Sequence, residues 1–247
     1  MKRSILSAAL SVCLLSCTVE TPSTLREFQF LAEFTPATRL HLEGTLSPLL
    51  SGRYWQWSAI DVLTLQYLDG EELASIPSTS VRLVSDGRSA VFTFRIPSSA
   101  RAVSAEFGSA AAFGETCPAS QDIPAGMVYA RASIPGGVGE ENLPAGVLRH
   151  ACSYLLIHPA VPGKTVRSIT VSGSGLKGPG SGAQTLTFPV EGTDPFWLAL
   201  SNEAVGVVVE AADSQSGKTV LARLDHLGNG ACELYEIHYK PIIDYRQ

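Results

Sequence analysis

The side chains best suited to acid–base or metal chemistry are five histidines, and their spacing limits what they could do. No two of them stand at the H-x-x-x-H or H-x-x-E-H spacing of a zinc site. The nearest arrangement puts Glu236 two positions before His238, so both would share one face of a strand. One carboxylate beside one imidazole does not make a site. The sequence therefore predicts a protein that is not an enzyme, with no catalytic residue, metal or cofactor.

Lipidation of a cysteine is the chemistry that the N-terminal residues favour. A positive start, Met1–Arg3, precedes an apolar and small run from Ile5 to Leu15, which is shorter than the ~20 residues that span a bilayer. Leu14-Leu15-Ser16-Cys17 then resembles the lipobox of bacterial lipoproteins. The sequence predicts a signal peptide over residues 1–16, lipidation of Cys17 and a polar tether over residues 17–24. The alternative is an ordinary secretory signal with an incidental cysteine.

Three further cysteines stand far apart in the sequence, at Cys117, Cys152 and Cys232. If Cys17 carries lipid, their number is odd, so at most one disulfide can form within the chain. The sequence leaves the pairing among the three open. Buried thiols are the simpler interpretation, because an unoxidised cysteine behaves as a small apolar residue.

The tryptophans could bind sugar rings or fill the core. Trp55 and Trp57 stand two apart, so on a strand they would share a face, and Trp197 lies in a later apolar run. An exposed pair would form an aromatic platform for a glycan. Core packing is favoured over the platform, especially for Trp57, because an apolar strand follows it directly and large rings bury much surface.

Composition narrows the class of protein. The chain has 247 residues, a formal net charge of -5, 45% hydrophobic residues and 17% charged residues. A negative balance disfavours nucleic acid as a partner, because phosphate binding needs a basic face. The apolar content is enough to build a core, and the length allows one or two domains. Abundant glycine and proline, 22 and 15 residues, suit short strands joined by turns.

Short alternating runs predict strands along the whole chain. Two hairpins stand out: residues 81–84 and 90–96 flank Asp86-Gly87, and residues 205–211 and 219–224 flank a polar turn. No amphipathic helix of twelve residues is apparent. We expect an all-β protein of two β-sandwich domains in tandem. A glycine-rich loop ending at Gly146 divides them into residues 25–146 and 147–247.

Several motifs, in a fixed order, resemble the fimbrillin-like lipoproteins of Bacteroidales, the family of type V pilus proteins. Phe34–Gly44 is similar to the family's Thr-Arg-x-x-(apolar)-(acid)-Gly stretch, and Trp57–Leu63 is similar to the Trp-Ser motif that opens the next strand. Later, Arg149–Leu156 and Val166–Ser172 resemble the opening two strands of the family's second domain. Ile60 stands where the family usually has glycine. The resemblance covers residues 28–239.

The resemblance implies two transthyretin-like β-sandwiches and a lipoprotein anchored in the outer membrane at the cell surface. It also implies a protease that cuts after an arginine near the N-terminus, at Arg39, which lies in the matching motif, or at Arg26. Losing the strand within Leu25–Arg39 would expose a groove that a strand of another subunit fills. The implied partners are other fimbrial subunits, the protease, the lipid anchor, and host or bacterial surface ligands.

The expected function is therefore that of a fimbrial subunit, or an accessory or anchor component, with a role in adhesion. The sequence ends soon after its last expected strand, at residues 242–247, whereas a shaft subunit would carry a longer donor segment. Tip, anchor and accessory roles stay open beside the shaft. The alternative function is a surface glycan-binding lipoprotein that uses Trp55, Trp57 or Trp197.

Overall fold

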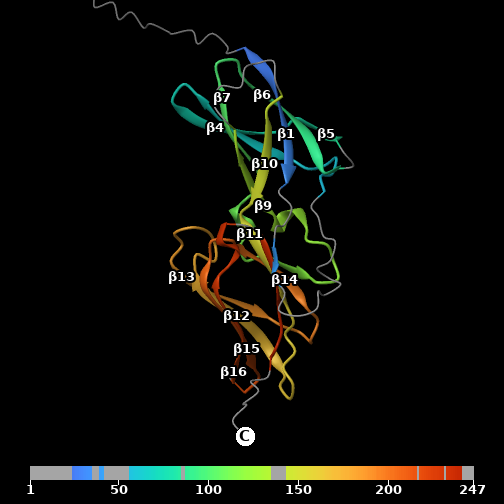
Figure 1. Cartoon of the computed structure of the whole chain (residues 1–247), viewed down its shortest axis with the longest axis vertical. Coiled ribbons are helices and arrows are strands. Elements are labelled where there is room, and N and C mark those ends of the chain that lie inside the picture. Colours follow the sequence, from blue (N-terminus) through green and yellow to red (C-terminus); the bar gives the residue numbers. More distant parts are fainter. Residues whose placement is uncertain are drawn as a thin grey trace, which may run out of the picture.

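The structure is a computed structural model that describes residues 24–34, 39–41, 56–84, 87–134, 143–215, 217–230 and 232–240. Its regular elements in these ranges are strands and three short 3-10 helices, which confirms the expected all-β class. The 3-10 helices are η2 (Ala110–Ala112), η3 (Ala125–Met127) and η4 (Gly228–Gly230). Within the described residues, no helix has the length and apolar character needed to cross a membrane. The two sandwiches lie at opposite ends of the molecule (Figure 1).

The N-terminal sandwich is one eight-stranded sheet folded back on itself, in the order β4-β3-β7-β9-β10-β1-β6-β5. Its strands are β1 (Leu25–Phe34), β3 (Leu63–Asp69), β4 (Glu72–Pro77), β5 (Ser80–Val84), β6 (Ser89–Pro97), β7 (Arg101–Gly108), β9 (Tyr129–Ser133) and β10 (Ala145–His150). β10 forms the corner, because Ala145–Leu148 pairs with β1 whereas Arg149 and His150 pair with β9. Apolar side chains from both halves meet in one core.

The C-terminal sandwich pairs a five-stranded sheet, β2-β17-β11-β14-β8, with a four-stranded sheet, β13-β12-β15-β16. The first sheet contains β2 (Arg39–His41), β8 (Thr116–Pro118), β11 (Cys152–Ile157), β14 (Phe196–Ser201) and β17 (Glu233–Ile237). The second contains β12 (Val166–Ser174), β13 (Ala183–Pro189), β15 (Val205–Asp213) and β16 (Lys218–His226). β11 is buried along its whole length, because one face of its sheet packs on the four-stranded sheet and the other on residues 112–129.

The predicted hairpins are present as β5–β6 and β15–β16. On β6 the alternation is as expected, with Phe92 and Phe94 fully buried and Arg95 exposed. Gly146, expected in a loop, lies in β10 instead. The expected division between residues 146 and 147 stays a prediction. In the structure it falls inside β10, and the edge strands β2 and β8 of the C-terminal sheet come from residues before it.

Candidate functional site: the seat of the first strand

The first strand, β1, occupies an interior position of the N-terminal sheet between β6 and β10 (Figure 1). It pairs antiparallel with β6 in nine registered positions, from Leu25 opposite Pro97 to Glu33 opposite Ser89. It pairs parallel with β10 in four, from Leu31 opposite Ala145 to Phe34 opposite Leu148. A parallel neighbour so distant in sequence cannot be reached by a hairpin. Without β1, the facing backbone edges of β6 and β10 would have no partner strand.

Alternate side chains of β1 fill the core of the N-terminal sandwich. Phe30 and Ala32 are fully buried, and Phe28 and Phe34 pack against the same cluster. The intervening residues Glu27, Gln29 and Glu33 are exposed. The strand therefore contributes both a set of backbone hydrogen bonds and a row of apolar side chains, the two features by which an added strand is recognised.

A glycine on the neighbouring strand makes room for the largest of these side chains. Gly146 of β10 lies beside Ala32, and the ring of Phe30 covers it. A Cβ at position 146 would lie 2.9 Å from Cε2 of Phe30, and closer still to Cζ. The pocket that receives Phe30 therefore exists partly because Gly146 has no side chain.

The end of β1 meets a buried histidine. The ring of Phe34 stacks on His150 with centroids 4.9 Å apart and packs on Trp57 at 4.5 Å. Nδ1 of His150 is buried and has no hydrogen-bond partner among the described residues. Burial lowers the pKa of His150 to about 4, because the charged imidazolium would lose its hydration there. His150 also lines a cavity of about 1020 Å³ between the two sandwiches.

The two candidate cleavage arginines lie in different surroundings. Arg26 is half-buried within β1, where its Nη2 donates to the carbonyl of Ala100 at 3.0 Å and its guanidinium lies 5.8 Å from the centroid of the Phe28 ring. Arg39 is the first residue of β2, whose backbone pairs parallel with Glu233 of β17. A cut after Arg39 would fall within β2 and free the whole of β1, whereas a cut after Arg26 would leave most of β1 attached.

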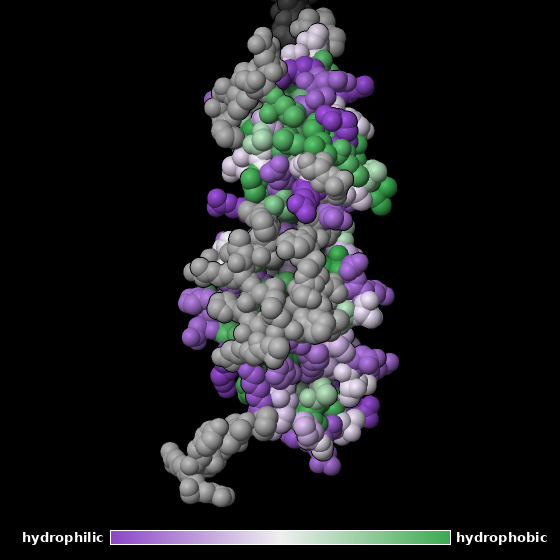
Figure 2. Space-filling view, turned by 45° about the vertical axis from the view of Figure 1, so that its right-hand side comes forward, coloured by the Kyte–Doolittle hydropathy of each residue, from purple (hydrophilic) through white to green (hydrophobic). Residues whose placement is uncertain are grey.

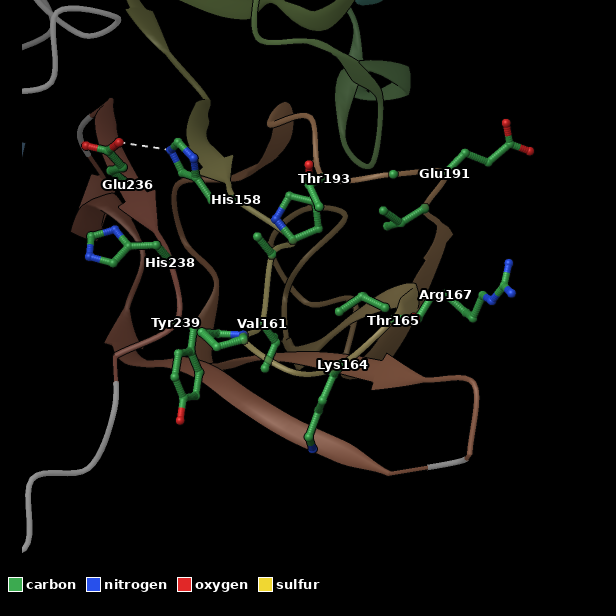
Figure 3. Close-up of a pocket in the computed structure, with 16 residues that line it drawn as sticks. His158, Val161, Lys164, Thr165, Arg167, Glu191, Thr193, Glu236, His238 and Tyr239 are labelled. Carbon is green, nitrogen blue, oxygen red and sulfur yellow. Dashed lines mark hydrogen bonds and ion pairs between the residues drawn. The ribbon is translucent and has the colours of Figure 1, made fainter.

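A second cavity, of about 800 Å³, lies at the far end of the C-terminal sandwich (Figure 3). Nε2 of His158 lies 2.9 Å from Oε1 of Glu236, and the His238 ring packs edge-on against His158 with centroids 6.3 Å apart. Glu236 therefore pairs with His158 rather than with His238, the neighbour expected from the sequence. On another side of the cavity, Lys164 is hydrogen-bonded to Thr219 at 2.8 Å. The described residues contain no group of three His, Cys, Asp or Glu that could hold a metal ion.

The glycan platform is not supported where the structure describes it. Trp57 is 3% exposed and Trp197 is fully buried, so neither ring can stack on a sugar. The reason is packing: Trp57 contacts Phe34, Phe92 and Phe107, and Trp197 lies in the core between β11 and β8. The core interpretation is therefore correct for both. Trp55 and the lipidation site Cys17 lie outside the described residues.

Exposed apolar side chains concentrate in the N-terminal half of the chain. Figure 2 shows hydrophobic residues gathered on the N-terminal sandwich, while hydrophilic residues are more frequent on the C-terminal one. The exposed large hydrophobic residues before β11 are Leu25, Ile60, Val62, Leu73, Leu83, Leu143 and Val147. Ile60, within the Trp57–Leu63 motif that is expected to open a strand, is 88% exposed because β3 starts only at Leu63.

No protein-family model matches the chain, and no curated protein matches it in sequence. The chain is similar in structure to fimbrial proteins of Bacteroidales. A candidate cell adhesion protein from Parabacteroides distasonis aligns over 89% of this chain and 98% of its own, with 10% identity and a TM-score of 0.44. A fimbrial assembly protein from the same species aligns over 86% and 90%, with 10% identity and a TM-score of 0.41. The fimbrial anchor protein Mfa2 from Porphyromonas gingivalis aligns over 82% and 83%, with 10% identity and a TM-score of 0.38.

Proposed function

We propose that the chain is a component of a fimbrium, either a subunit or an accessory or anchor protein, that assembles by strand addition and serves adhesion. The observation that carries this proposal is the position of β1. β1 lies inside a sheet and supplies the core residues Phe30 and Ala32. Along the chain, β2, which belongs to the C-terminal sheet, comes between β1 and β3, the next strand of the N-terminal sheet. Such a strand can be replaced by one from another molecule that offers the same alternation.

The proposed route begins with export and lipidation of Cys17, which anchors the precursor in the outer membrane. Proteolysis after Arg39 then releases β1, and a strand from another fimbrial subunit takes its place. Arg39 is preferred over Arg26 because Arg39 begins a three-residue strand at the edge of its sheet. Arg26 lies in an interior strand, where its side chain contacts Ala100 and Phe28, so a cut there would require β1 to leave its sheet first.

Removal of β1 would leave a groove between β6 and β10, the seat of β1. The unpaired backbone groups and the apolar pocket of this seat determine which strand could fill it. The edges of β6 and β10 would present unpaired N–H and C=O groups, each of which is costly to leave without a partner. The core would lose the Phe30 ring and gain a pocket bounded by Gly146. The replacing strand must therefore be extended, with a large apolar side chain at the position of Phe30 and a small one two residues later.

The test is electrophoresis of outer membranes in detergent, with unheated and boiled samples probed by antiserum to this chain. A ladder that collapses on boiling is expected, because strand-exchanged subunits dissociate only when they unfold. A single band at the full mature mass in both lanes would contradict the proposal. The alternative is a glycan-binding lipoprotein. Trp57 and Trp197 are buried, so they cannot form its aromatic platform.

A further inference from the structure

Cys152 is the first residue of β11, and Cys232 directly precedes β17, the strand that pairs with β11. β11 and β17 run parallel in a register that places Tyr154 opposite Leu234 and Ile157 opposite Ile237. Continued by two residues toward the start of both strands, the same register places Cys152 opposite Cys232. The strands are still side by side there, because the backbone N–H of Glu233 donates to Oγ of Ser153 at 3.1 Å.

The two thiols also face the same way. Both belong to the apolar cluster that contains Tyr154 and Leu156, the alternate residues of β11 on that face. Neighbouring strands are ~4.8 Å apart, which is within the range of roughly 4.4–6.8 Å between the Cα atoms of disulfide-bonded cysteines. In the structure both residues are buried thiols.

The third cysteine of the cluster is out of reach. Cys117 of β8 lies opposite Trp197 of β14, which in turn lies opposite Leu156 of β11. Cys117 is therefore two strands away from β11 and about four positions along it from Cys152. With ~4.8 Å between strands and ~3.3 Å per residue, that separation exceeds what a disulfide can span. The register selects one of the three pairings that the sequence leaves open.

We propose that Cys152 and Cys232 form a disulfide in the exported chain. This rests on the proposed export, since the bond forms where a thiol–disulfide oxidoreductase supplies the oxidising disulfide. One cysteine attacks that disulfide to give a mixed disulfide, and the other displaces the enzyme. The chain loses two electrons and two protons as its two thiols become one S–S bond, and the oxidoreductase gains them as its disulfide becomes two thiols.

The bond forms before the C-terminal sandwich closes. Burial raises the pKa of both thiols to about 12 in the folded chain, so the attacking thiolate is scarce once β17 has docked. For the same reason the finished bond is protected from exchange. It ties β17, which carries β2 on its other edge, to the central strand β11.

The test needs no variant, because trypsin places each cysteine on its own peptide. The chain is extracted from the membranes of producing cells in N-ethylmaleimide and digested without reduction. We expect residues 150–164 linked to residues 224–246, and Cys117 alkylated on residues 102–131. Alkylated Cys152 and Cys232 in the exported chain, whether it carries lipid on Cys17 or begins at Leu40, or a link to Cys117, would overturn the proposal.

Refolding separates this proposal from the fimbrial one. The denatured, reduced chain is refolded in a mixture of reduced and oxidised glutathione, where the 152–232 link should again form, and form equally in Cys117→Ser. Cys152→Ser should lose the faster migration of the oxidised chain on a non-reducing gel, and Cys117→Ser should keep it. Absence of the link after refolding would overturn the proposal even if export fails. The heat-sensitive ladder tests the fimbrial role and does not depend on this bond.

Discussion

The ring of Phe30 on β1 lies over Gly146 on β10, in the space where any other residue would place its Cβ. The two residues belong to strands that are far apart in sequence and parallel in the sheet. Their contact makes the seat of β1 selective for a strand with a large side chain at this one position. It also makes Gly146 the simplest place to alter the seat without touching β1.

Gly146→Ala should destabilise the N-terminal sandwich, because the new methyl group overlaps the Phe30 ring. Overpacking a closed core costs about 1–3 kcal/mol, which urea unfolding would detect. Gly126→Ala is the matched control, since a Cβ there meets nothing within 4 Å. Partial recovery is expected when Gly146→Ala is combined with Phe30→Leu. Equal stability of the two glycine variants would refute the contact.

A strand supplied separately should enter the vacated seat. A chain that begins at Leu40 is titrated with a synthetic peptide of residues 24–39, and binding is followed by calorimetry. Phe30→Ala in the peptide should weaken binding more than tenfold, because removing a buried phenylalanine costs ~3–5 kcal/mol. Gln29→Ala, at an exposed position of the same strand, should bind as the parent peptide does. If both variants bind equally, the peptide does not occupy the seat.

Arg39→Ala should stop maturation and Arg26→Ala should not. The first change removes the proposed cleavage site and the second removes a side chain that is hydrogen-bonded to Ala100. Mass spectrometry of the extracted protein reads the new N-terminus, expected at Leu40 in the wild type. In Arg39→Ala the heat-sensitive ladder should also disappear. If Arg39→Ala is processed normally and Arg26→Ala is not processed, the cleavage site is Arg26.

The free energy of unfolding should fall as the pH is lowered between the pKa of His150 in the unfolded chain and its lower pKa in the folded chain. Its pKa is about 4 in the folded chain and 6.5 ordinarily, so between these values the unfolded chain binds the extra proton. The stabilisation is complete above pH 6.5 and is lost by about pH 4, an effect of ~3 kcal/mol. His150→Phe should remove this part of the slope of unfolding free energy against pH. An unchanged slope would mean that His150 is hydrated.

Tyr235→Phe should weaken the C-terminal sandwich. The Tyr235 hydroxyl donates to the buried carboxylate of Glu233 and accepts from the backbone N–H of Gly228 at 3.1 Å. Removing it leaves two buried polar groups without this partner, which costs roughly 1–3 kcal/mol for each group. Thermal unfolding measures the loss. A melting temperature within a degree of the wild type would contradict the network.

Local patterns in the sequence predicted much of the fold. The alternation of Phe92, Phe94 and Ile96 identified β6, and the polar turn after residue 211 identified the β15–β16 hairpin. The apolar character of Ile60 was misleading, because composition cannot tell an exposed turn from the start of a strand. These successes depend on neighbours within a few residues, where hydrophobic periodicity carries the signal.

The seat itself could not be derived in this way. The parallel pairing of β1 with β10, and of β2 with β17, joins segments more than a hundred residues apart. Gly146 looked like part of a glycine-rich loop, since a missing side chain gives no sign of the ring that will cover it. His150 belongs to the Arg149–Leu156 stretch that resembles the family, but nothing in that stretch indicates a buried imidazole. Only the resemblance to fimbrial lipoproteins pointed to the first strand as the proposed functional element.

The nine registered pairs between β1 and β6 have a mechanical consequence for any strand that replaces β1. A pull along that strand acts parallel to both neighbours, so the hydrogen bonds share the load in shear. They cannot be peeled apart one after another, as they would be by a force across the strand. A strand held in this seat would resist tension along its own length and yield more readily to sideways force at a strand end.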